Sequence, residues 1–151
     1  RTAVALVACA LAACSKGAPD VAPLLPLLRE DGQLVELLTE AEELARGGNT
    51  TNAARNLREV VVPRARANWE ASGRVAVRHP RAEALRVRIA RAASDRLDAT
   101  EQLAALFTAG DPTQIPRVLR LMDRVDRSVN QLEADVQQAR TQPPERGCAA
   151  R

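Results

Sequence analysis

Few side chains in this 151-residue chain have chemistry of their own: three cysteines, one histidine and one methionine. Cys14 is distinctive because two alanines precede it directly and an uncharged run, residues 2–13, separates it from Arg1. A positive residue, a short apolar run and small residues, in this order, are the layout of a secretory signal. The run is shorter than the roughly 20 apolar residues that span a bilayer. We therefore expect a signal for export that places the Cys14 thiol at a processing site.

The residues Leu11-Ala12-Ala13-Cys14 resemble the lipobox of bacterial lipoproteins. The resemblance implies cleavage before Cys14, a diacylglyceryl thioether on its sulfur and an acyl group on the new amino terminus. Because Ser15 follows the cysteine, it also implies the periplasmic face of the outer membrane if the organism is Gram-negative. Leu6-Val7-Ala8-Cys9 fits the pattern less well, since it leaves only residues 2–8 as the apolar run. Two or three acyl chains would attach the protein permanently, whereas one anchors only marginally.

Cys148 is the thiol that remains if processing removes Cys9 and lipidates Cys14. An odd cysteine in an exported protein suggests either a disulfide between two copies or a free thiol. Its place in the last four residues also fits an inert thiol on a frayed tail.

Catalytic and metal-binding patterns are absent from the sequence. The single histidine, His79, precedes a proline at a helix junction, where we expect a helix cap or an exposed loop residue rather than a catalytic base. No CxxC, HExxH or Glu-x-x-His spacing occurs, and an acidic run such as Glu40, Glu42 and Glu43 is usually solvated. His79 and Met122 could serve as axial haem ligands, but Met122 occupies a regular apolar position. We expect no enzyme, no metal and no cofactor other than the acyl groups on Cys14.

The composition of the chain limits the classes of partner that it can bind. The net charge of +3 and the near absence of aromatic residues disfavour nucleic-acid binding, which needs basic surfaces and stacking side chains. We expect contact with membrane lipid through the anchor, and with an unidentified envelope protein. A homodimer through Cys148 or through the last helix is a further expectation.

The chain divides into four parts: a signal peptide (1–13), a lipidated tether (14–22), a helical domain (23–140) and a flexible tail (141–151). A core of Leu, Val, Ile and Ala with almost no aromatic residues suits packed helices and argues against a β-sandwich or barrel. We predict an all-α fold, an antiparallel up-and-down four-helix bundle preceded by the signal peptide. The short connections between helices favour that topology.

The predicted helices cover residues 23–46, 51–78, 80–109 and 113–140. Gly47-Gly48 and Gly110 end the first and third, Thr50 or Thr51 caps the second, and Thr113 caps the fourth. Pro63 should kink or split the second helix. Spacings of three and four predict the buried side chains of the first three helices as Leu27, Leu28, Leu34, Val35, Leu38, Ala41 and Ala45; Leu57, Val61, Ala65, Trp69 and Ser72; and Leu85, Ile89, Ala93, Leu97, Thr100, Ala104 and Phe107.

The fourth helix has the clearest pattern. Its apolar positions alternate steps of three and four without a break, which is a heptad pattern, at Ile115, Val118, Met122, Val125, Val129, Leu132, Val136 and Ala139. This stripe either completes the core of its own bundle or pairs with a helix of a partner, and we favour the core.

Charge is unevenly distributed between the first two helices. Residues 20–48 hold seven acidic and two basic side chains, whereas residues 49–79 hold two acidic and six basic ones. Mutual pairing of these neighbours is the simplest interpretation. The alternative is contact with anionic headgroups near the anchor, through Arg64, Arg66, Arg74, Arg78 and Arg81.

The sequence therefore predicts a membrane-anchored lipoprotein with a non-enzymatic helical body that acts as an adaptor through protein–protein contacts. In layout and composition it resembles many small bacterial lipoproteins of uncharacterised function. The alternative is a carrier that binds a lipid or small apolar ligand between its helices, with an opening created at Pro63.

Overall fold

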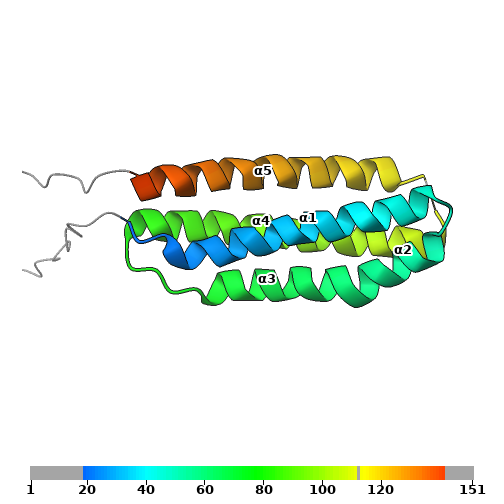
Figure 1. The fold of residues 1–151 in the computed structure, drawn as a ribbon, viewed down its shortest axis with the longest axis horizontal. Helices are drawn as coiled ribbons and strands as arrows, with labels where there is room; N and C mark the ends of the chain where they lie inside the picture. Colours follow the sequence, from blue (N-terminus) through cyan, green and yellow to red (C-terminus); the bar gives the residue numbers. More distant parts are fainter. Residues whose placement is uncertain (1–18, 112, 142–151) are drawn as a thin grey trace, which may run out of the picture.

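A computed structural model describes residues 19–111 and 113–141 of the chain, and these residues contain helices and no strand. Three segments are long single helices, and α2, η2 and α3 follow one another without a break, so that four helical rods result (Figure 1). The elements are η1 (Ala22–Leu24), α1 (Leu25–Arg46), α2 (Thr50–Asn56), η2 (Leu57–Val61), α3 (Val62–Arg74), α4 (Pro80–Ala109) and α5 (Ile115–Thr141).

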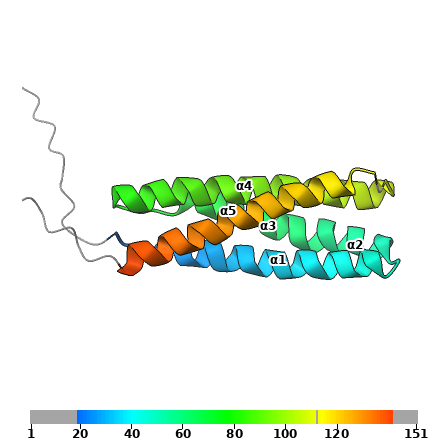
Figure 2. The ribbon, with the colours of Figure 1, turned by 90° about the horizontal axis from the view of Figure 1, so that it is seen from above.

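The four rods lie side by side along one axis. In Figure 1 the chain runs in one direction through α1 and α4 and returns through α3 and α5. The start of α1 and the end of α5 therefore lie at the same end of the body. Figure 2 shows that α5 crosses obliquely, from the α4 side where it begins to the α1 side where it ends. This crossing separates the beginning of α5 from the end of α1.

The core consists of two groups of buried side chains. One group fills the half near the start of α1, and the other fills the half near its end. The first contains Val21, Leu24, Leu27, Leu28, Ala82, Leu85, Ile89, Ala92, Val125, Val129, Leu132, Val136 and Ala139. The second contains Leu34, Leu38, Ala41, Leu57, Val61, Ala65, Leu97, Ala99, Leu103, Ala104, Val118 and Met122.

The heptad stripe of α5 belongs to this core. Seven of its eight positions, from Val118 to Ala139, are buried within the chain, and only Ile115 is half-buried. The core interpretation of the stripe is therefore confirmed, and the stripe is not available for pairing with a partner helix.

Two predicted helix ends were wrong. The second helical rod ends at Arg74 rather than at residue 78, and the chain continues in extended form from Val75. Val75 and Val77 are half-buried and pack against the first core group, so burial of their side chains competes with continuation of the helix. The cap of α2 is Asn49, whose side chain accepts a hydrogen bond from the Asn52 amide at 3.4 Å.

The predicted cap of the last helix was also wrong. The helix α5 begins at Ile115, and the amides of Arg117 and Val118 bond to the carbonyl of Gln114. Thr113 instead donates its amide and its hydroxyl to the carboxylate of Asp111, at 2.9 and 2.6 Å. Thr113 therefore lies two residues before the first residue of α5, in the turn, and Gln114 occupies the position directly before the helix.

Pro63 divides the second rod as expected, through a turn of π-helix. Proline has no N–H and cannot donate to the carbonyl four residues earlier. The chain widens over η2 just before it, where the amide of Val62 bonds to the carbonyl of Leu57, five residues back. Single π-turns of this kind are rare and occur inside α-helices, at places where the hydrogen-bond ladder is interrupted.

The side chain of Trp69 was wrongly predicted to be buried. It is 43% exposed, and the neighbouring Asn68 is buried in its place. The Asn68 side-chain amide donates to the carbonyl of Leu27 at 3.3 Å, which links α3 to α1. A hydrogen bond across the bundle therefore decides which face of α3 points inward, and the apolar pattern alone does not reveal it.

Within the described residues, no helix combines the length and the apolar character that a bilayer crossing requires.

Candidate functional site

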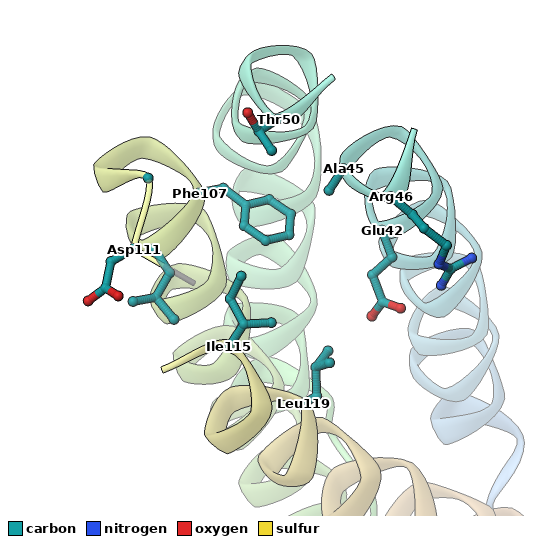
Figure 3. Close-up of a pocket in the computed structure, with 10 residues that line it drawn as sticks. Glu42, Ala45, Arg46, Thr50, Phe107, Asp111, Ile115 and Leu119 are labelled. Atoms are coloured by element: carbon teal, nitrogen blue, oxygen red, sulfur yellow. The ribbon is translucent and has the colours of Figure 1, made fainter. Parts of the chain in front are cut away.

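A pocket of about 450 Å³ lies at the end of the bundle where α1 and α4 end and α5 begins. This volume falls within the range of small-molecule sites. Figure 3 shows Phe107, Ile115 and Leu119 on one side of the space and Glu42 and Arg46, from α1, on the other. The lining residues are Glu42, Ala45, Arg46, Thr50, Leu106, Phe107, Gly110, Asp111, Ile115 and Leu119.

The turn after α4 shapes one wall of this pocket. Gly110 has a φ of +66°, in the left-handed region that glycine adopts without strain. It lets the Asp111 amide return to the carbonyl of Leu106 at 3.2 Å, the closing bond of a Schellman motif. The chain then reverses into α5, which places Ile115 on the same side of the pocket as Phe107 (Figure 3). In Figure 3 the Asp111 carboxylate points away from the centre of the pocket, in keeping with its hydrogen bonds to Thr113.

Glu42 is the charged group best placed to act inside the pocket. Its side chain is half-buried, and burial raises its pKa, while Arg46 opposes the rise and Asp123 and Asp126 of α5 add to it. No hydrogen bond joins its carboxylate to another of the described residues. A carboxylate that faces an apolar wall and has no hydrogen-bonded partner favours binding of a cation.

A second charged group lies at the centre of the bundle. Arg96 on α4 is 1% exposed. Its guanidinium donates two hydrogen bonds to the carboxylate of Asp31 on α1, from Nε to Oδ1 at 3.2 Å and from Nη2 to Oδ2 at 2.8 Å. Its Nη1 also pairs with Asp126 of α5 at 2.7 Å. Burial disfavours the charged form of Arg96, but the two carboxylates outweigh it and raise its pKa. This network joins three helices at the boundary between the two core groups.

Neither the pocket nor the buried Arg96 network was expected from the sequence. Arg96 lies one position before the apolar Leu97 and four after Ala92, so its position on the buried face could have been read from the helical period. Its partner Asp31 is 65 residues away in the sequence, and no local pattern predicts that the two side chains pair. The pocket results from the oblique path of α5, which leaves no signal in the sequence.

The arginines proposed for anionic surfaces are placed as follows. Arg64 binds Glu30 of α1 at 2.8 Å and Gln33 at 2.6 Å, and Arg66 binds Glu101 of α4 at 2.6 Å. Arg74 pairs with Glu70 on its own helix at 2.9 Å. Arg78 and Arg81 lie in exposed positions around the start of α4. The Arg64–Glu30 pair supports mutual pairing of the first two rods, and contact with anionic lipid stays a prediction.

His79 and Met122 occupy structural positions. The Nδ1 atom of His79 accepts a hydrogen bond from the Arg81 amide at 3.1 Å, so His79 caps α4, one of the two roles expected for it. Met122 is buried in the second core group. Within residues 19–111 and 113–141, no group of three or more His, Cys, Asp or Glu side chains is arranged to hold a metal ion.

The lipobox Leu11, Ala12, Ala13 and Cys14, together with Cys148, lies outside the described residues. No model of a protein family matches the chain, and neither the curated proteins nor the solved structures contain a match.

Proposed function

We propose that this protein is an envelope lipoprotein, anchored through Cys14, whose helical body acts without catalysis as an adaptor for another envelope protein. The observation that carries the anchor is the sequence Leu11-Ala12-Ala13-Cys14 at the end of a short uncharged run. We further propose that the body is an antiparallel up-and-down four-helix bundle and that residues 1–13 are its signal peptide.

The lengths of the parts suggest how such a protein would stand on a membrane. Val21 belongs to the first core group and Ala22 begins η1, so the tether from Cys14 to Val21 spans at most about 25 Å. The 30 residues of α4 make a rod of about 45 Å. If the chain is anchored at Cys14, the end of the body where α1 starts lies near the lipid. The pocket then faces away from it, where a partner or ligand can approach.

The adaptor role is supported by apolar side chains left on the surface. Among the described residues, the large hydrophobic side chains with the greatest exposure are Val60, Trp69 and Val87, which come from η2, α3 and α4. Trp69, the only tryptophan of the chain, is 43% exposed. Tryptophan is enriched among residues that dominate binding at protein interfaces. We propose that the surface around Trp69 contacts the partner.

The anchor is tested by cell fractionation. The Cys14→Ser variant should move from the membrane fraction to the soluble fraction, because lipidation needs the thiol. The matched Cys9→Ser variant should remain with the membrane, since that cysteine lies in the discarded segment. If Cys14→Ser still pellets with membranes, the anchor proposal fails, and if only Cys9→Ser is released, the weaker site is the lipidated one.

The adaptor role is tested by proximity crosslinking in intact envelopes. Trp69→Ala should reduce the yield of a reproducible crosslinked partner, whereas Arg124→Ala, an exposed position on α5, should leave it unchanged. A wild-type protein that yields no reproducible partner would contradict the adaptor role.

A carrier function is the second candidate, and the pocket favours it. The pocket lies between α1, α4 and α5, however, and its lining does not include Pro63, where the sequence suggested an opening.

A further inference from the structure

We propose that the pocket between α1, α4 and α5 binds an organic amine, with its apolar body against Phe107, Ile115 and Leu119 and its ammonium group at Glu42. This inference names the ligand class for the carrier function proposed above, and it does not depend on the anchor or on a protein partner.

The apolar wall sets the body of the ligand. Leu106 and Phe107 come from the last turns of α4, and Ile115 and Leu119 come from the first turns of α5. All four side chains are half-buried rather than enclosed by the core. Within the heptad stripe of α5, Ile115 is the one position that the bundle does not bury, and it lies in the pocket. An alkyl or aryl group placed there would remove this remaining apolar surface from water, which is the main source of affinity in small-molecule sites.

The opposite wall sets the charge of the ligand. Figure 3 shows the Glu42 side chain reaching toward Ile115 and Leu119, with the Arg46 guanidinium further from that wall. Arg46 is exposed and solvated, whereas Glu42 is half-buried. An ammonium group at Glu42 gains a charge-assisted hydrogen bond in a partly dehydrated place. A ligand carboxylate in the same position would meet Glu42 directly, with Asp123 close enough to add to the repulsion.

The charges around Glu42 leave this interaction open to a ligand. Asp126, the other acid near Glu42, is already paired with Arg96 at 2.7 Å. Arg46 attracts the Glu42 carboxylate from the next turn of α1, but no hydrogen bond joins the two side chains. Glu42 therefore lies on the wall opposite Phe107, Ile115 and Leu119, and no hydrogen bond to another of the described residues occupies its carboxylate.

The test is calorimetric titration of the purified full chain with octylamine, octanol and octanoate, three probes that share one apolar body. Octylamine should bind about tenfold more tightly than octanol, the difference expected for one hydrogen bond to a charged group. Octanoate should bind most weakly. Glu42→Gln should remove the preference for the amine while octanol binding persists. Glu36→Gln, the same change at an exposed position of α1 outside this pocket, should keep the preference.

The outcomes separate the ligand class from the carrier function. Equal binding of octanol and octylamine, or an amine preference that survives Glu42→Gln, overturns the amine proposal and leaves a carrier of neutral apolar ligands. Failure of all three probes to bind overturns both. Ala45→Phe, which fills the pocket from α1, should abolish binding of every probe, and unchanged binding in that variant would place the probes elsewhere and overturn the assignment.

Discussion

Arg96 joins α4 to α1 and α5 at the centre of the bundle. A buried guanidinium is tolerated only when its charge is matched, and Asp31 and Asp126 provide that match from two other helices. Such a network specifies how helices align, because a shift of α1 or α5 along α4 would separate the charges. Apolar side chains could fill the same space with similar stability. The network therefore contributes to the register of the helices rather than to the free energy of unfolding.

At this position we expect Asp31→Asn to lower the free energy of unfolding by about 3 kcal/mol, because Arg96 would keep its buried charge and lose its bidentate partner. Urea denaturation followed by circular dichroism measures the change. Asp123→Asn, at an exposed position of α5, serves as the control and should change stability little. The double variant Asp31→Leu with Arg96→Met should recover most of the loss, and a double variant as unstable as the single one would contradict this account.

Glu42 makes stability depend on pH. Because its pKa is raised in the folded protein, the folded state holds this proton more strongly than the unfolded state does. The ordinary pKa of a glutamate is 4.5. The contribution of Glu42 to stability therefore falls as the pH rises from 4.5 through the raised pKa of the folded protein. Glu42→Gln should stabilise the protein at pH 7, by less than about 1 kcal/mol since the group is half-exposed. The difference between the variant and the wild type should vanish below pH 4, and a difference that does not change with pH would contradict the assignment.

At the scale of the elements, glycines and a proline determine where the rods end or change. Gly110 ends α4 in a left-handed conformation, whereas Gly32 lies inside α1 with nothing within 4 Å of a Cβ placed there. Pro63 forces a π-turn but does not end the rod. Glycine therefore ends a helix at position 110 and is accommodated inside one at position 32, because the two positions adopt different backbone angles.

The two glycines predict a matched pair of substitutions. Gly110→Ala should lower the free energy of unfolding by about 1 kcal/mol, because an alanine Cβ is strained at a φ of +66°. Gly32→Ala should raise it by about 0.5 to 1 kcal/mol through helix propensity. Thermal unfolding of both variants checks the pair, and two changes of the same sign would show that the backbone at one site is misassigned.

At the scale of the whole molecule, the burial of the α5 stripe limits how the protein can assemble. The stripe supplies one wall of both core groups, so it cannot exchange its partner helices for those of a second copy without unfolding. A homodimer that keeps this fold in each copy would use another surface or the Cys148 thiol.

We expect the thermal midpoint in the presence of a reductant to be independent of protein concentration, as it is for a monomer. Val129→Asp should lower that midpoint strongly, because it buries an unpaired charge at a position that is 7% exposed. Analytical ultracentrifugation should give the same mass for the variant and the wild type below their midpoints. A midpoint that rises with concentration would indicate a dimer and contradict this expectation.

The sequence by itself determined the elements: the all-helical class, the end of α1, both bounds of α4, the interruption at Pro63 and the buried stripe of α5. These features follow from residues within one or two turns of each other, where backbone preference and helical period act directly. The sequence is also the whole basis for the proposed anchor at Cys14.

Only the tertiary structure decided the burial of Arg96, the exposure of Trp69 and the pocket at Glu42. The first depends on a partner 65 residues away, and the second on a hydrogen bond from Asn68 to a helix 41 residues earlier. The third depends on the angle at which α5 crosses α1 (Figure 2). Packing between distant segments selects among faces that local preference leaves nearly equal, and for that reason the site emerged only when the helices were in place.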